Sequence, residues 1–335
     1  MFRFCPRSIW SFILKLNSGI IPHFLNSKLA DSLEKTLATL LLQSVSTIYN
    51  KKPIIHPVVC MNAVKNILGD VRESPSDVLL TYGNNFIKGL SSRRNDRKVL
   101  EDMPNEEIGM TIFISDLEDA CQHGNATQVQ HEAARVYLAA DGSPAILEIL
   151  AELALQNVEG NGGFIYHCLR AFAFKPEKER VWSFVQCILK TIKKQPLPPP
   201  NVGMNNGPKD MKLIFLNCEK PIDWVTIAAV SRLWESEYGR LPGFKREISH
   251  WISNQNTTKN KNPDGSNPDN IMRFKKNGGS YFVKVAENII KSNDQVVERL
   301  SALEALRYFV KKMPIDCLPI VAKKINFLMD NNESR

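Results

Sequence analysis

Apolar residues recur every three or four positions along most of this 335-residue chain. The run LADSLEKTLATLLLQSVSTIY, residues 29–49, is typical, since this spacing places apolar side chains on one face of a helix. In HPVVCMNAVKNIL a proline follows the first residue, and a helix tolerates proline only in its first turn. We therefore expect a helix to begin at His56 or Pro57. Alternating strand patterns are scarce, and MKLIFLN, residues 211–217, is the one short candidate for a strand.

The middle of the chain shows the clearest helical pattern. Residues 110–124, 126–140 and 143–157 read as three amphipathic helices separated by the pairs GN and DG, whose glycines suit helix ends. Two further helices are expected within residues 162–174 and 177–194. Helices joined by such short connections pack antiparallel as hairpins. The pattern predicts an all-α array of antiparallel helical hairpins, similar to a helical repeat, with about a dozen helices and little or no strand.

Breaks in the helical pattern predict the domain organisation. Residues 1–28 form an N-terminal extension or targeting segment, and residues 29–195 form a helical domain. The run QPLPPPNVGMNNGPKD cannot continue a helix, so residues 196–222 are expected to be a linker or loop rich in proline and glycine. Residues 223–330 hold the C-terminal helices. The polar, low-complexity part of this region predicts a disordered loop at 255–278.

Composition and charge narrow the class of protein. With 43% hydrophobic residues, the chain can bury a sizeable core. The net charge of +8 is concentrated in two segments: four basic residues precede the first acidic one, Asp31, and residues 257–279 hold five basic and two acidic residues. Because the rest is nearly neutral, nothing indicates a basic face for nucleic acid. No apolar run reaches the length of roughly 18 residues that a transmembrane segment needs.

The seven cysteines and the N-terminus bear on localisation. The cysteines form no C-x-x-C pair, and most lie in apolar runs, which favours buried, reduced thiols in an intracellular reducing compartment. The first 24 residues contain no acidic residue and mix arginine, serine and bulky apolar residues. They fit an organellar transit segment if the source is eukaryotic, and equally an amphipathic N-terminal helix.

Two histidines are the main candidates for chemistry. KKPIIHPVVCMNAVKNIL and GNGGFIYHCLRAFAFKPE each carry an apolar lead-in, then a histidine expected at a helix start, then a helix of small and apolar residues. An imidazole acts as acid or base near neutral pH, so His56 and His167 are predicted to line one cavity as a catalytic pair. The alternative is that each histidine hydrogen-bonds to the backbone at a helix start and has only a structural role.

Neighbouring residues predict the rest of this site. Phe164, Tyr166 and Phe172, together with Asn62 from the helix after His56, are expected to line a substrate pocket. The alternative is that the aromatic residues are ordinary core. The histidines and carboxylates of residues 118–132 are interpreted as a solvated polar face, so no metal site is predicted, and no motif identifies a cofactor.

The order of motifs in residues 112–174 resembles the questin-oxidase-like helical proteins. The similarity lies in DACQHGN, then EAARVYLAADG, then ILEILAELALQ and a glycine-led FIYHCLRAF. In that family, histidines at helix starts are thought to line an internal cavity, and members are linked to oxidative cleavage of aromatic polyketides. The resemblance implies a corresponding role for His167 and, through the similarity of the two histidine segments, for His56.

Two functions from different classes follow. The first is a binding or scaffold module with a helical-repeat-like surface, whose partner is an apolar small molecule or a protein. The second is an oxygenase-like enzyme with an internal cavity, in which His56 and His167 act on an apolar or aromatic substrate. The enzyme is favoured if the two imidazoles meet across a closed pocket, and the binding module is favoured if they point apart.

Overall fold

A computed structural model describes residues 27–50, 54–104, 111–192, 197–204, 207–255 and 265–330. Contacts divide the chain into two units, residues 1–36 and 37–335. In the first unit, the described residues are the start of helix α2 (Ser27–Val45), which continues into the second unit. The predicted N-terminal extension of residues 1–28 falls almost entirely outside the described residues.

Helices make up nearly all regular structure in the described residues, which confirms the predicted all-α class. Within the described ranges there are 16 α-helices, more than the dozen expected, and three short 3-10 helices. In chain order after α2 the α-helices are α3 (Pro57–Leu68), α4 (Asp77–Lys88), α5 (Lys98–Glu101), α7 (Ile114–His123), α8 (Ala126–Ala139), α9 (Ala145–Leu155), α10 (Val158–Phe174), α11 (Val181–Ile192), α12 (Pro208–Asn217), α13 (Pro221–Trp234), α14 (Leu241–Ser253), α15 (Asp269–Asn277), α16 (Tyr281–Ser292), α17 (Val296–Lys312) and α18 (Leu318–Met329). The 3-10 helices are η1 (Gly69–Val71), η2 (Lys178–Arg180) and η3 (Ile315–Cys317).

The single strand candidate is wrong. Residues 211–217 belong to helix α12, which begins at Pro208 in the first turn, where proline suits a helix. Met211, Ile214 and Phe215 are buried, and this spacing of three and four residues is helical. Among the described residues, the only strand-like pairing is an isolated antiparallel bridge between Thr47 and Ser92.

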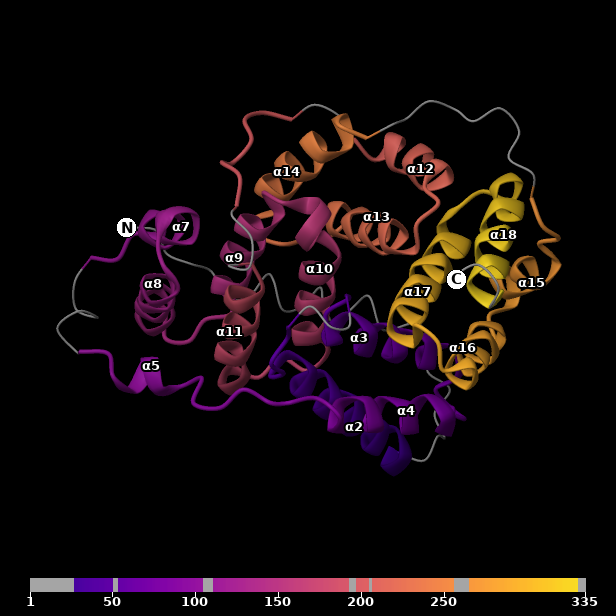
Figure 1. Ribbon diagram of the computed structural model, residues 1–335, viewed down its shortest axis with the longest axis horizontal. Coiled ribbons are helices and arrows are strands. Elements are labelled where there is room, and N and C mark those ends of the chain that lie inside the picture. Colours follow the sequence, from indigo (N-terminus) through magenta and orange to yellow (C-terminus); the bar gives the residue numbers. More distant parts are fainter. Residues whose placement is uncertain are drawn as a thin grey trace. The chain divides into compact units, whose positions relative to one another are not determined.

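Four helices from distant parts of the chain form the centre of the second unit. Helix α10 packs on α13, α13 on α17, α17 on α3, and α3 on α10, so the four close a ring of contacts (Figure 1). We call this arrangement the central ring. Each of its helices is largely buried. In α3, for example, 11 of the 12 residues are buried, and Asn66 is the exception. The central ring therefore holds the core, as well as the polar side chains described below.

The glycines before Phe164 lie inside helix α10 and do not precede it. Helix α10 starts at Val158 and is capped by Asn157, so His167 lies in mid-helix, and its predicted place at a helix start is wrong. The physical reason is close packing of α10 on α13. A Cβ atom at Gly162 would lie 3.1 Å from Val230 Cγ1, and one at Gly163 would lie 3.4 Å from Val225 Cγ1. Glycine is tolerated inside this helix because it lets the two backbones approach.

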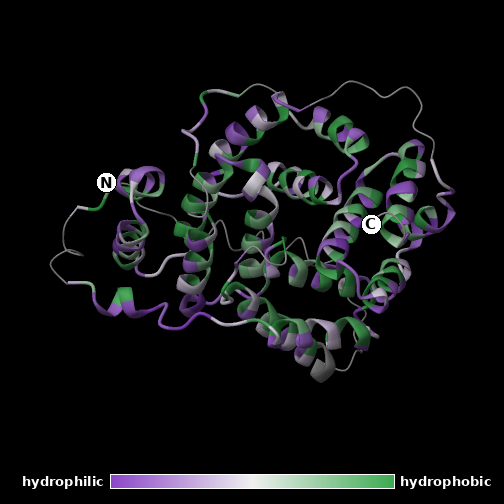
Figure 2. Cartoon of the chain, viewed as in Figure 1, coloured by the Kyte–Doolittle hydropathy of each residue, from purple (hydrophilic) through white to green (hydrophobic). Residues whose placement is uncertain are grey.

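The remaining helices cover the central ring from several sides. Helices α9, α11 and α14 pack beside α10, and α8 and α7 extend this group (Figure 1). On another side, α15, α16 and α18 pack against α17, and α4 contacts both α3 and α16. The helices carry hydrophobic and hydrophilic residues together, whereas the segment leading into α5 is mostly hydrophilic (Figure 2). None of the helices in the described residues is both long and apolar enough to cross a membrane.

Helices from both sides of residue 200 share one core, because α13 and α17 pack against α10 and α3. The second unit therefore does not divide at the predicted linker. That linker, residues 196–222, contains α12, whose apolar residues pack on α13. Helix α15 likewise lies within residues 255–278, because Ile271 and Phe274 are buried there; residues 256–264 of the predicted loop lie outside the described residues.

Candidate functional site

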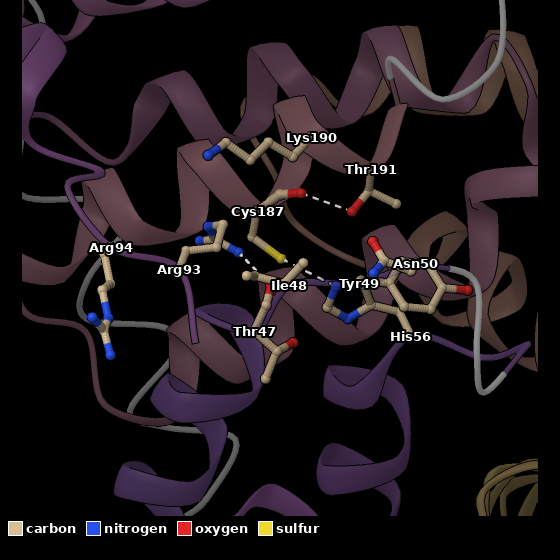
Figure 3. A pocket seen from close by; sticks show the side chains of 10 residues that line it. All are labelled: Thr47, Ile48, Tyr49, Asn50, His56, Arg93, Arg94, Cys187, Lys190 and Thr191. Atoms are coloured by element: carbon tan, nitrogen blue, oxygen red, sulfur yellow. Dashed lines mark hydrogen bonds between the residues drawn. The ribbon is translucent and has the colours of Figure 1, made fainter. Parts of the chain in front are cut away.

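A pocket of about 330 Å³ lies between the segment that follows α2, the start of α3, the segment after α4, and helix α11. Thr47, Ile48, Tyr49 and Asn50 line it together with His56, Arg93, Arg94, Cys187, Lys190 and Thr191. Figure 3 shows Arg94 and Lys190 at one side of this pocket and Tyr49 and His56 at the other, with Cys187 between them. The volume is at the lower end of the range for pockets that bind small molecules.

His56 caps helix α3, and this cap determines which ring nitrogen carries the proton. The backbone N–H of Val58 donates to His56 Nδ1 over 3.2 Å, so Nδ1 is unprotonated. In the neutral ring the proton is then on Nε2, which lies 3.6 Å from Cys187 Sγ. His56 therefore donates a hydrogen bond to the Cys187 sulfur. The predicted helix start at His56 is confirmed. The imidazole also packs against the rings of Tyr49 and Phe164, with centroid distances of 4.6 and 4.8 Å.

Arg93 joins the elements that form one wall of the pocket. Its guanidinium donates to the carbonyls of Val45, Thr47 and Ser183 and forms an ion pair with Asp96. Five donors in a fixed planar fork allow one arginine to satisfy several carbonyls at once. The side chain of Arg93 is only 6% exposed. Arg93 thereby connects the end of α2 to α11.

The charge of the pocket is positive. None of its ten lining residues carries a carboxylate, whereas three are cationic. Asp96 lies just outside the lining, and besides Arg93 it accepts a bond from Lys190 over 3.5 Å. Arg94 has neither an ion pair nor a hydrogen bond within the part of the chain that the structure describes. A small anion in this pocket would thus meet an unpaired guanidinium and a weakly paired ammonium.

Cys187 lies beside a second thiol. Burial raises the pKa of Cys187, but a hydrogen bond from Cys168 and the proximity of His56 and Arg93 outweigh it, so the pKa lies well below the ordinary value. The pKa of Cys168 is raised by burial and by its hydrogen bond to Cys187. Both residues are about 1% exposed, on the neighbouring helices α10 and α11.

A second group of polar residues lies inside the central ring. Asn62 Nδ2 of α3 lies 2.8 Å from His167 Nδ1 of α10. Glu304 of α17 accepts two bonds from Arg232 of α13, of 2.6 and 2.8 Å, and a third from Asn66 of α3 over 2.9 Å. Arg232 also lies over the rings of Tyr166 and Tyr308, at 5.1 and 4.3 Å from their centroids. Each of the four helices therefore contributes a side chain to this group.

Burial controls the protonation of His167. The side chain is 1% exposed, and burial lowers its pKa to about 3, although the nearby Glu304 carboxylate opposes the shift. A neutral imidazole at pH 7 hydrogen-bonds without a counterion. The Asn62 carbonyl oxygen next to it is buried and has no hydrogen-bond partner in the described residues. His167 thus has the surroundings of a neutral core histidine.

Lys65 is the least satisfied charge in the central ring. It is 9% exposed, and its Nζ lies 5.0 Å from the centroid of the Phe174 ring, with no carboxylate bound to it in the described residues. Burial and the positive charge of Arg170 lower the pKa of Lys65 to about 7, whereas Glu304 partly opposes the shift.

Replacing Lys65 by methionine is expected to stabilise the protein by about 2 kcal/mol at pH 6, because the variant no longer buries an amine that lacks a partner. The pKa of Lys65 is about 7 in the folded state against 10.5 as the ordinary value. Between these values the unfolded chain holds more protons, so wild-type stability rises with pH. The gain in Lys65→Met should therefore shrink as pH rises from 7 toward 10.5. Urea unfolding of the wild type and the variant at pH 6, 8 and 10 measures this gain in the free energy of unfolding.

Lys284→Met, on an exposed position of α16, is the matched control and should show no such trend with pH. A gain in Lys65→Met that stays constant from pH 6 to pH 10, or a loss of stability at pH 6, would contradict the assignment of an unpaired buried amine.

The predicted site residues do not come together at one site in the structure. Asn62, Tyr166 and His167 lie in the polar group of the central ring. His56 lines the pocket, with the Phe164 ring packed 4.8 Å from its own. The sixth residue, Phe172, packs edge-on against Phe184 of α11. His167 is not among the residues that line the pocket, so the two imidazoles lie in different environments.

Sequence reasoning missed Cys187, Arg93 and Lys190. Cys187 is 131 residues from His56 in the chain, and no short motif signals a contact of that kind. Arg93 and Arg94 lie in the polar stretch after α4, which has the composition of an ordinary surface loop. The one available signal for these pocket residues was a pair of arginines next to apolar helices, and such a pair does not indicate which residues it contacts.

In the described part of the chain, no group of three or more histidine, cysteine, aspartate or glutamate residues is placed to hold a metal ion. Comparisons with protein-family models, with curated proteins and with solved structures found no match to this chain.

Proposed function

We propose that this protein is a helical binding module whose pocket between α3 and α11 takes a small anionic molecule. The observation that supports the proposal is the lining of the pocket: three cationic side chains and no carboxylate among ten residues. Arg93 is neutralised by Asp96, which leaves Arg94 and Lys190 to attract the ligand. The hydroxyl and amide groups of Tyr49, Asn50 and Thr191 would orient it. A carboxylate or a phosphate group has the chemistry that such cations bind.

Binding of two simple anions tests the proposal. Isothermal titration calorimetry of the full chain with inorganic phosphate and with succinate should show one site for at least one of them, and erythritol, which is uncharged, should not bind. In the double variant Arg94→Gln/Lys190→Gln we expect about tenfold weaker binding, which corresponds to roughly 1.4 kcal/mol. Binding should also weaken with salt, because the rim of the pocket is exposed.

Lys178→Gln is the matched control, because Lys178 is a surface lysine that pairs with Asp141 and does not line the pocket. It should bind like the wild type. Two outcomes would overturn the proposal: neither anion binds at millimolar concentration, or binding is the same in the wild type and in the double variant, which would place the anion elsewhere.

The oxygenase-like enzyme remains the alternative, with His56 and His167 as its catalytic pair and an apolar or aromatic substrate. It has less support than the binding module, because His56 bonds to Cys187 whereas His167 bonds to Asn62. A His167→Ala variant that stays folded and still binds the anion is what the binding module predicts. A scaffold role toward a protein partner stays a prediction.

A further inference from the structure

A second pocket, of about 320 Å³, lies beside helices α5, α8 and α11. Helix α8 packs on both α5 and α11 (Figure 1). Lys98 begins α5 and Asp102 follows its last residue, and both line the pocket, together with Gln130 of α8 and with Gln186 and Lys190 of α11. We call it the α5–α8–α11 pocket. Lys190 also lines the pocket between α3 and α11, so the two pockets are neighbours.

One side chain of the α5–α8–α11 pocket is a buried hydrogen-bond donor without a partner. Gln186 is 1% exposed, and its Nε2 group has no acceptor within the part of the chain that the structure describes. An unbonded buried N–H costs free energy, and in folded proteins a bound water or ligand usually completes such a bond. The terminal amide of glutamine rotates over a broad range, so a ligand in the pocket can supply the acceptor. Gln186 thus points to an occupant that carries an oxygen acceptor.

The α5–α8–α11 pocket carries charges of both signs that do not neutralise each other. The side chains of Lys98 and Asp102 both line it, yet neither forms an ion pair or a hydrogen bond among the described residues. The other two charged side chains are occupied, because Asp96 pairs with Arg93 over 3.0 Å and with Lys190 over 3.5 Å. An unpaired ammonium and an unpaired carboxylate in one pocket suit a ligand that itself carries both charges.

We infer that the α5–α8–α11 pocket binds a free α-amino acid with a short polar side chain. The ligand carboxylate pairs with Lys98, its ammonium pairs with Asp102, and Gln186 donates to a ligand oxygen. Val99 is the single apolar residue of the lining, and the amide of Gln130 is left for a polar side chain, so a large apolar side chain finds no matching surface. A simple anion would meet two carboxylates in this lining, and a simple cation would meet two ammonium groups.

Calorimetric titration of the full chain with amino acids and their blocked forms tests the inference. L-Glutamine or L-serine should bind at one saturable site. N-acetyl-L-glutamine lacks the ammonium and L-glutaminamide lacks the carboxylate, so each should bind at least about tenfold more weakly than L-glutamine. Absence of binding by both amino acids at millimolar concentration would overturn the inference. Equal affinity for L-glutamine and its two blocked forms would overturn it as well, because the pocket would then not recognise both charges.

Variants at the lining residues locate the ligand. Lys98→Gln and Asp102→Asn each remove one charge at an exposed position, and each should weaken binding of L-glutamine about tenfold. Glu101→Gln is the matched control, because Glu101 is an exposed carboxylate of α5 that does not line the pocket, and it should bind like the wild type.

Gln186→Leu separates a binding role from a structural one. The variant loses the unpaired donor, so binding of L-glutamine should weaken at least about fivefold, while the midpoint of thermal unfolding stays the same or rises. A lower midpoint together with unchanged binding would show that Gln186 only supports the fold, and would contradict its role as a ligand donor.

The anion site of the neighbouring pocket is tested independently. Arg94→Gln should weaken phosphate binding and leave L-glutamine binding unchanged, because Arg94 lines only the pocket between α3 and α11. Asp102→Asn should do the opposite. Binding of L-glutamine that is lost in Arg94→Gln and kept in Asp102→Asn would place the amino acid in the pocket between α3 and α11 and overturn the inference. Absence of phosphate and succinate binding with intact L-glutamine binding would reject only the proposed function.

Discussion

Replacing Glu304 by leucine is expected to lower the free energy of unfolding by about 3–5 kcal/mol, because it leaves a buried guanidinium without its counterion. Glu304 is 1% exposed and accepts bonds from Arg232 and Asn66. Without it, Arg232 stays enclosed between two tyrosine rings. Urea unfolding followed by circular dichroism measures the loss. In the double variant Glu304→Leu/Arg232→Met, which removes both charges, we expect much of the stability to return.

The matched control is Glu235→Gln, which breaks an exposed ion pair with Lys312 and should change stability by less than about 1 kcal/mol. Equal losses of unfolding free energy in Glu304→Leu and Glu235→Gln would show that the buried ion pair stabilises the protein no more than the exposed one.

Acid provides a second measurement on Glu304. Burial opposes ionisation of this carboxyl, but Arg232 dominates and lowers its pKa to about 2, against an ordinary value of 4.5. The stability that comes from the ionised carboxylate is present above pH 4.5 and is lost as pH falls toward 2. The difference between wild type and Glu304→Leu should therefore shrink over that interval. A difference that stays constant from pH 5 to pH 2.5 would contradict the assignment.

Replacing Trp182 by alanine should cost about 3–5 kcal/mol of unfolding free energy, the usual range for removing a buried aromatic side chain. Trp182 lies in the first turn of α11, is 1% exposed, and its ring centroid lies 5.1 Å from that of Tyr137. Its indole N–H donates to the Asp96 carbonyl over 2.6 Å, so it also holds the loop that carries Arg93. Thermal and urea unfolding give the change in stability. Calorimetry on the folded fraction should show weakened phosphate binding.

Trp182→Phe separates the two roles of this side chain. It keeps most of the apolar packing and removes the N–H, so a loss of about 1–2 kcal/mol is expected. Phe113→Ala, at a side chain that is 59% exposed, is the control and should stay within about 0.5 kcal/mol of the wild type. If Trp182→Phe were as unstable as Trp182→Ala, the hydrogen bond to Asp96 would be the main contribution, and the packing argument would be wrong.

Local patterns predicted most helices correctly because helix formation depends on neighbours three and four residues apart. Helices α7, α8 and α9 lie where the periodicity places them, and Asn125 caps α8 by accepting the Gln128 N–H. The start of α3 at Pro57 follows from the steric demands of proline. These features need no knowledge of distant residues.

Tertiary packing overrode local signals at particular places. The glycines before Phe164 read as a helix boundary, yet they lie inside α10, because α13 approaches closely there and a Cβ atom at Gly162 would make a tight contact with Val230. Residues 211–217 have an alternating appearance, yet they form α12 against α13. In both places the neighbour that decides the conformation is far away in the chain.

The sequence alone predicted the apolar face of each helix and singled out His56 and His167 as candidate functional residues, because both depend on residue type and local spacing. The structure alone decided that His167 meets Asn62, 105 residues away, and that His56 meets Cys187, 131 residues away. A helix buries its apolar stripe against any complementary partner, so periodicity does not specify which polar side chains then face each other. That pairing depends on how α3, α10, α13 and α17 pack against one another and on the placement of α11 beside α10.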